Sequence, residues 1–396
     1  MKCLAPMMVL IVVLFTSCSS SDDGNSDDNQ FPVPSMYQFS RNGSSSVSYS
    51  QQANGIAMAD EFISALSDNG STEAELIGMF TNTGNYFSTT TLNQSPFKLR
   101  SNTAASFDYY ANNQTVANTI KADFDAWISG QANEVYPNWN SAASVGVAGM
   151  LVEADGITTR RVNAKGMQYN QALGKMLLGG LMVDQMLNNY LSISVLDAST
   201  NRIDNDNEVL VSGSNYTAME HSWDAAFGLA FGSDNAQNPQ FNQDLFMNKY
   251  ISRVDVDPDF NGIADDIYDA FKLGRAAIVA KDYELRDQQI DILREKFSEI
   301  MGVRCIYYLR QSRSNLDSDK ANAFHDLSEG YGFIYALQFT RKPGSSAPYF
   351  TKSEVDVYLA QLLEGNGFWD VSEDTLNQIA FAIAARFNFT VEQAEN

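Results

Sequence analysis

The chain has 396 residues, 44% of them hydrophobic, and a formal net charge of −22 at pH 7. Such a charge repels nucleic acid and anionic surfaces, which we therefore exclude as partners, and it favours cations, cationic partners or simple solubility. The length allows one large domain or two smaller packed units.

The first 17 residues have the features of a lipoprotein signal peptide. A basic Lys2 precedes the apolar run Met7–Phe15, and small residues lead to Cys18. The run is shorter than the roughly 20 apolar residues that a permanent membrane helix needs. The string Leu14-Phe-Thr-Ser-Cys18 resembles a lipobox. We therefore expect Cys18 to carry lipid and to anchor the mature chain to the outer membrane.

Residues 18–36 are predicted to form a disordered, acidic tether. They are rich in Ser, Asp and Asn and hold few large apolar side chains, so they cannot form a core. The run Ser21–Asp28 resembles the export tether of Bacteroidetes surface lipoproteins, which implies a position on the cell surface. Without residues 1–17 the chain keeps 25 basic and 48 acidic residues, a formal charge of −23. The folded domain is expected to span residues 37–396.

From Tyr37 onward, apolar residues recur with a helical period more often than with the alternation of a strand. Capping boxes, in which Thr is followed three positions later by Glu, open segments at Thr72, Thr217 and Thr351. The sequence therefore predicts an all-α fold of helical bundles. The predicted helices are Gln52–Leu66, Thr72–Phe80, Thr115–Ile128, Val162–Leu191, Thr217–Phe231, Phe241–Val254, Asp265–Lys281, Glu284–Gln311, Asp319–Phe339, Thr351–Leu363 and Leu376–Phe387.

The segment Val162–Leu191 is predicted to be the central helix, because its apolar residues surround most of the circumference. Gly174, Gly179 and Gly180 would let a neighbouring helix approach closely. These are features of a core, and they carry no chemistry.

Both histidines of the chain open the same short pattern of His, five residues, an aromatic residue and Gly. The pattern covers His221–Gly228 and His325–Gly332, and a weaker repeat precedes each copy. We infer an internal duplication, with approximate halves 37–232 and 233–396.

Each histidine is expected to share a helix face with a carboxylate. His221 and Asp224 are three residues apart, and His325 and Glu329 are four apart. Such a pair can bind a metal or another ligand, hold a catalytic tautomer, or form a buried ion pair. The structural alternative stays open, because a single pair of this kind is more often structural than catalytic.

The segment Asn215–Gly228, together with the lipobox and the helix end Asp184–Leu191, resembles a Bacteroidetes lipoprotein family without assigned function (domain of unknown function 4856) that is distantly similar to imelysin. Imelysin-like proteins consist of two related helical bundles and are associated with bacterial iron uptake. The resemblance thus implies this fold, iron or another transition metal as ligand, and an outer-membrane receptor as partner. Of their Gly-x-His-x-x-Glu motif, His221 is retained, whereas Met219 and Asp224 replace the Gly and the Glu.

The most ligand-like string of the chain runs from Asp255 to Asp266. Carboxylates at alternate positions, followed by Asn-Gly, can surround a calcium ion, which takes about six to eight oxygen ligands. The string resembles calcium loops of the thrombospondin type 3 kind, and we expect a structural calcium ion here. The alternative is an acidic turn in which Asp265 or Asp266 caps the next helix. The candidate calcium ligands are Asp257, Asp259, Asn261, Ile263 through its carbonyl, and Asp265.

The sequence lacks a His-Glu-x-x-His zinc-peptidase helix, a Gly-rich phosphate loop and a Gly-x-Ser-x-Gly turn. We therefore expect a surface lipoprotein that is not an enzyme and that binds a metal, a metal complex or a receptor in iron acquisition. One alternative is a surface protein that captures glycan or peptide nutrients, with Phe and Tyr side chains as a stacking platform. The other is a hydrolase that uses His221 with Asp224.

Overall fold

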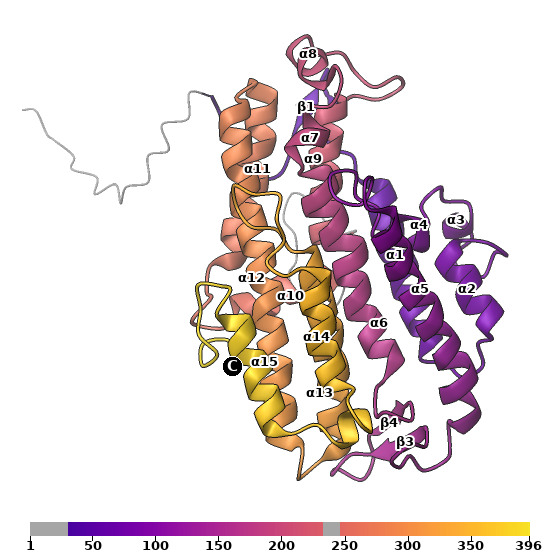
Figure 1. Cartoon of the computed structure of the whole chain (residues 1–396). Helices are drawn as coiled ribbons and strands as arrows, with labels where there is room; N and C mark the ends of the chain where they lie inside the picture. Colours follow the sequence, from indigo (N-terminus) through magenta and orange to yellow (C-terminus); the bar gives the residue numbers. More distant parts are fainter. Residues whose placement is uncertain (1–30, 233–245) are drawn as a thin grey trace, which may run out of the picture. The chain divides into compact units, whose positions relative to one another are not determined.

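The computed structural model describes residues 31–232 and 246–396 (Figure 1). The predicted signal peptide, Cys18, most of the tether and the first residues of the predicted helix Phe241–Val254 lie outside the described residues. From Val33 onward the chain forms one compact unit. Both predicted halves belong to this unit, and their origin by duplication stays a prediction.

Helices dominate the described chain, as the sequence predicts, and two short antiparallel hairpins are its only sheets. The N-terminal part contains β1 (Ser40–Arg41), β2 (Ser44–Ser45), α1 (Ser50–Leu66), α2 (Glu73–Thr81), α3 (Thr90–Asn93), α4 (Leu99–Asn102), α5 (Gln114–Gly130), β3 (Gly149–Val152), β4 (Thr159–Val162), α6 (Tyr169–Leu177), α7 (Ile193–Leu196), α8 (Asn201–Asp206) and α9 (Ala218–Phe231). The C-terminal part contains α10 (Phe246–Asp255), α11 (Ile263–Ala280), α12 (Tyr283–Asn315), α13 (Lys320–Ala336), α14 (Lys352–Leu362) and α15 (Glu373–Ala384).

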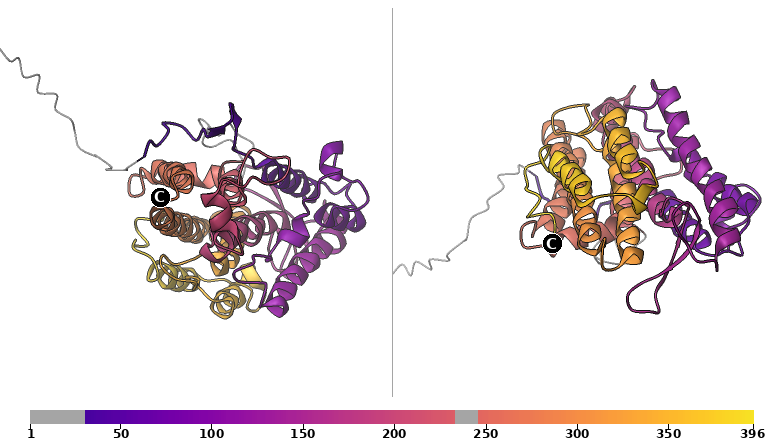
Figure 2. Two further views of the ribbon diagram at one scale, coloured as in Figure 1. Left: turned by 90° about the horizontal axis from the view of Figure 1, so that it is seen from above. Right: turned by 60° about the horizontal axis from the view of Figure 1, so that its bottom comes forward.

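The helices form a bundle in which the N-terminal and C-terminal parts take opposite sides. The 33-residue helix α12 packs against α11, α13 and α15, and α13 also packs against α6. Figures 1 and 2 show α1 to α5 on one side of the bundle, the helices from α10 onward on the other, and α6 and α9 between them. No described helix combines the length and the apolar character that a membrane crossing requires.

The three predicted capping boxes are all present. The hydroxyls of Thr72, Thr217 and Thr351 each accept the backbone N–H three residues later, and the Glu at that position reaches back to the threonine N–H. Each box satisfies two helix-end donors, so the starts of α2, α9 and α14 follow from local sequence.

The predicted helix Val162–Leu191 begins later than expected. Val162 ends strand β4, and the helix starts at Tyr169 and continues beyond α6 through π-helical turns to Tyr190. The intervening turn forms because the side-chain oxygen of Asn163 accepts the N–H groups of Lys165 and Met167, both at 2.9 Å. This local polar turn precedes the helix, which therefore begins later than the apolar pattern suggested.

The close helix approach predicted at the glycines of the central helix is found at Gly179. A Cβ atom at this position would lie 2.6 Å from the Cα of Ala336 in α13 and would also meet its Cβ. At Gly174 the nearest atom would be a flexible Ile63 methyl at 3.8 Å. Of these two positions, only Gly179 therefore requires a residue without a side chain.

We expect Gly179→Ala to lower the free energy of unfolding by about 1–3 kcal/mol, because the added methyl group overpacks the contact with α13. The matched control is Gly174→Ala, which has room for its methyl group and should leave stability unchanged or raise it. Urea denaturation of both variants measures the difference. Equal midpoints for the two variants would contradict the close approach of α13 and the π-helical turn Leu178–Val183 that follows α6.

Candidate functional site

The region around His221 is organised by a buried arginine. Arg275 of α11 is fully buried between two acidic side chains of α9. Its Nε donates to Asp224 at 3.0 Å, and its Nη1 donates to Glu220, also at 3.0 Å. Arg41 of β1 donates two further bonds to Glu220, at 2.7 and 3.0 Å, and the hydroxyl of Tyr37 donates to Asp224 at 2.6 Å. This cluster therefore joins the N-terminal segment to α9 and α11.

Asp224 and His221 are linked through one residue rather than paired with each other. The N–H of Ser48 donates to Asp224 at 3.1 Å, and the carbonyl of Ser48 lies 3.0 Å from Nδ1 of His221. A carbonyl only accepts, so Nδ1 carries a proton and donates to Ser48. The imidazole is half-buried and stacks on Tyr216 at 4.6 Å. Asp224 and His221 do share a helix face, and both side chains bind the backbone of Ser48.

The second predicted pair, on α13, does come together. Nε2 of His325 lies 3.8 Å from Glu329, whose carboxylate also pairs with Lys175 at 3.1 Å. Burial lowers the pKa of His325 to about 4, so the ring is neutral at pH 7. Burial also raises the pKa of Glu329, but Lys175 and His325 outweigh it, and the resulting pKa is about 2. This is a buried ion pair of Glu329 with Lys175, beside a neutral imidazole.

The two histidines have separate surroundings. His221 contacts Ser48 and Tyr216, whereas His325 contacts Gln168 and Glu329. Their helices, α9 and α13, are labelled at different heights of the bundle in Figure 1. Among the described residues, no group of three or more His, Cys, Asp or Glu side chains is placed to hold a metal ion.

The acidic loop between α10 and α11 is held by Asp255, which was not among the predicted ligands. One oxygen of this carboxylate accepts the N–H groups of Gly262 and Ala264, both at 3.0 Å, at the start of α11. The helix N-cap is Gly262, so the predicted capping by Asp265 or Asp266 is wrong. Both lie in the first turn instead, where their negative charges interact favourably with the positive end of the helix dipole.

The five candidate calcium ligands are spread along this loop. Asp257 accepts the N–H of Asp259 at 3.0 Å through one oxygen, and its other oxygen is buried without a hydrogen-bond partner among the described residues. Asn261 donates to the carbonyl of Asp255, and Ile263 and Asp265 follow in α11. Calcium at this loop stays a prediction, for which the spare oxygen of Asp257 is the supporting observation.

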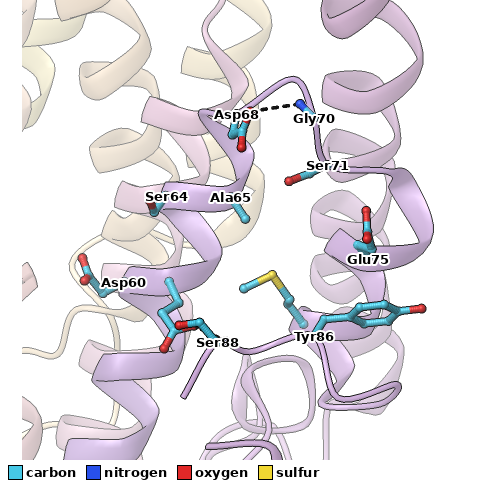
Figure 3. Close-up of a pocket in the computed structure, with 11 residues that line it drawn as sticks. Asp60, Ser64, Ala65, Asp68, Gly70, Ser71, Glu75, Tyr86 and Ser88 are labelled. Atoms are coloured by element: carbon cyan, nitrogen blue, oxygen red, sulfur yellow. Dashed lines mark hydrogen bonds between the residues drawn. The ribbon is translucent and has the colours of Figure 1, made fainter. Parts of the chain in front are cut away.

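A cleft of about 500 Å³ between α1 and the start of α2 is lined by several carboxylates (Figure 3). Each of three has a local partner: Asp68 accepts the N–H of Gly70, Glu61 accepts from Ser88, and Glu75 belongs to a capping box. Their acceptor capacity is used to shape turns, so this cleft suggests no ligand.

A smaller cleft of about 220 Å³ is lined by aromatic and charged side chains of α5, α13 and α14. Trp127 is half-buried there, with ring centroids 5.2 Å from Tyr331 and 5.9 Å from Tyr169. Tyr335 donates to Asp123 at 2.8 Å. We call this the Trp127 cleft.

A model of the family described as domain of unknown function (DUF4856) matches residues 34–390. The chain belongs to this family. The comparisons with curated proteins and with solved structures gave no match. DUF4856 has no assigned function, so membership establishes kinship over nearly the whole described chain.

Sequence reasoning missed Arg275 and Trp127. Arg275 had a visible signal, because it lies in the otherwise apolar string Gly274–Ile278, where an unpaired charge would be costly. Trp127 had none, since its position in a cleft depends on α13 and α14, which follow some 200 residues later in the chain.

We expect Arg275→Leu to destabilise the protein by about 3–5 kcal/mol, because Glu220 and Asp224 would lose a buried partner. The control is Arg100→Leu, which breaks a similar but half-exposed pair with Asp125 and should cost at most about 1 kcal/mol. Chemical denaturation monitored by circular dichroism measures both. A loss at Arg275 no larger than that at Arg100 would show that the cluster does not hold the fold together.

Proposed function

We propose that this member of DUF4856 is a lipid-anchored, non-enzymatic binding protein of the outer-membrane surface that captures glycans. The predicted signal peptide and Cys18 supply the anchor, and the acidic tether extends the folded unit from the membrane. The observation that carries the choice of ligand is the Trp127 cleft.

The Trp127 cleft combines an aromatic surface with hydrogen-bonding groups of both kinds. Asp123 and Asp356 offer carboxylate oxygens, and Lys352 offers an ammonium group that lies 2.8 Å from Asp356. A sugar hydroxyl both donates and accepts, and the apolar face of a sugar ring packs on an aromatic side chain. This combination suits a polyhydroxylated ring.

Of these groups, Lys352 disfavours a cationic ligand. The ammonium group of Lys352 lies 5.9 Å from the ring centre of Tyr335, where a bound cation would otherwise be attracted. The cleft of about 220 Å³ is also smaller than the roughly 300–1,000 Å³ that accommodates a drug-sized ligand. One sugar unit, such as the end of a glycan chain, is therefore the ligand we propose.

We expect the purified protein to bind members of a glycan array. Trp127→Ala should lower the affinity for the best of these ligands by about tenfold or more. Trp127→Phe keeps an aromatic face and should lose less. Trp139→Ala is the matched control, because Trp139 is half-buried beside Arg161 outside the cleft. An array without hits, or equal losses for Trp127→Ala and Trp139→Ala, would reject the proposal.

A second candidate function, binding of a metal complex in iron acquisition, is favoured by the geometry of His221. A histidine that ligates a metal commonly donates its other ring N–H to a backbone carbonyl, as His221 does to Ser48. One histidine suffices for a complex such as haem, which brings its other ligands with it. An outer-membrane receptor would then be the partner that accepts the complex.

For this candidate we expect haem to bind in a 1:1 complex whose Soret band shifts, and we expect His221→Ala to abolish the shift. His325→Ala is the control and should retain it. Elemental analysis of protein purified without chelator extends the test to ions: iron or zinc should be lost only with His221→Ala, and calcium only with Asp257→Ala. Absence of a Soret shift, together with no bound iron or zinc, would reject metal-complex binding, whereas absence of calcium would reject the predicted calcium site of the acidic loop.

A further inference from the structure

A second polar cleft lies where the first half of α12 faces the short helix α7 and the loop 342–348. Its volume is about 460 Å³, and among its lining residues are Asp108, Asp287, Asp291 and Arg294. Neither the Trp127 cleft nor the surroundings of His221 include any of these side chains. We call this the Arg294 cleft.

Arg294 is the unusual member of this lining. Only 6% of the residue is exposed, yet its Nε has no hydrogen-bond partner among the described residues. The contact of its Nη1 with Asp291 is long, at 3.5 Å. A buried guanidinium with an unused donor is costly unless an acceptor reaches it, and a carboxylate matches its fork of donors best.

A second buried arginine strengthens the preference for an anionic group. Arg341 is 2% exposed and donates from Nε to Asn188 at 2.6 Å, but its Nη1 has no partner within the described chain. Its charge repels that of Arg294, and Asp108 attracts both. Asp108 is thus near both guanidiniums, and the contact of Arg294 with Asp291 is long, so each arginine keeps a donor without an acceptor in the described chain.

The rim of the cleft requires that the ligand also carry a positive charge. Glu284, Asp287 and Asp291 line the same cleft, and they would repel a simple anion. Arg286 contacts Asp287, but both of its bonds go to Oδ1, so the second oxygen can accept from a ligand. A molecule with a carboxylate at one end and an ammonium group at the other satisfies both ends of the cleft.

The spacing along α12 gives the length of that molecule. Asp287 and Arg294 are seven residues apart and share a helix face, which places them about 10 Å apart along the axis. An extended peptide advances by about 3.3–3.6 Å per residue, so three residues cover this distance. We propose that the Arg294 cleft binds a peptide of about three residues, with its terminal carboxylate on Arg294 and its terminal ammonium group near Asp287.

This peptide site is independent of the proposed capture of glycans, and it uses different residues. The serines that line the cleft, among them Ser345 and Ser346 of the loop 342–348, can serve the peptide groups between the two termini. Because the groups that select the termini lie on one rigid helix, their separation is fixed. The site should therefore discriminate by peptide length and by free ends.

The test is isothermal titration of the protein with Ala-Ala-Ala, with its N-acetylated and C-amidated forms, and with alanine, acetate and methylammonium. We expect the free tripeptide to bind, and each blocked form to bind about tenfold more weakly or worse. Failure of the free tripeptide to bind at millimolar concentration overturns the proposal. Equal affinity for acetate would show a simple anion site, equal affinity for methylammonium a simple cation site, and either result overturns it as well.

Two variants assign the ends. Arg294→Lys keeps the charge but loses the planar fork. It should therefore lower the affinity for Ala-Ala-Ala about tenfold and leave the affinity for the amidated form unchanged. Asp287→Asn should lower the affinity for Ala-Ala-Ala and leave the affinity for the acetylated form unchanged. The controls are Arg304→Lys, a buried arginine with an unpartnered Nε outside this cleft, and the exposed Asp317→Asn.

If Arg294→Lys fails to fold by circular dichroism, Asp287→Asn alone decides. Its effect on the free tripeptide, compared with that of Asp317→Asn, must then be at least about tenfold. No difference between these two variants overturns the assignment. Loss of glycan binding through Trp127→Ala, with peptide binding intact, would keep the two sites distinct.

Discussion

The buried guanidinium of Arg275 is the contact on which the arrangement of the N-terminal segment depends. Its Nε and Nη1 bind Asp224 and Glu220, and its Nη2 reaches the hydroxyl and the carbonyl of Ser46. Two carboxylates buried on one turn of a helix would repel each other without it. Because Arg275 comes from α11 and Ser46 from the chain before α1, one side chain joins three segments. Together with Arg41 it neutralises the two charges that would otherwise exclude this packing.

The same cluster decides what His221 can do. Asp224 is fixed by Arg275 and by Tyr37, so it holds Ser48, and Ser48 in turn holds the imidazole through its carbonyl. Asp224 therefore acts on His221 only through Ser48, and it helps to fix the orientation of the imidazole ring. This arrangement lacks the direct contact between acid and histidine that a catalytic pair uses, and it fits a lone ligand for a metal complex better than a hydrolase.

Local signals predicted much of the fold, and long-range contacts account for what they missed. The capping boxes at Thr72, Thr217 and Thr351 depend on residues three apart, so the sequence alone placed those helix starts. Gly179 was one of three glycines expected to allow a close approach, but its partner Ala336 could not be named. The hydrogen bond between Tyr37 and Asp224 spans 187 residues, and no periodicity carries such information. At the acidic loop only the alternative was wrong, since Asp255 rather than Asp265 or Asp266 holds the start of α11, and the calcium site stays a prediction.

Buried arginines of this protein differ in how completely their donors are used, as Arg275 and Arg294 show. Arg275 and Arg294 are both buried, and both lie on long helices of the C-terminal part. Arg275 has acceptors for Nε, Nη1 and Nη2, so burial costs it little further and it can serve the fold alone. Arg294 lines a cleft, and its buried Nε has no acceptor in the described chain. Arg275 therefore supports the fold, whereas Arg294 borders a cleft, where a ligand carboxylate would supply an acceptor that the fold does not.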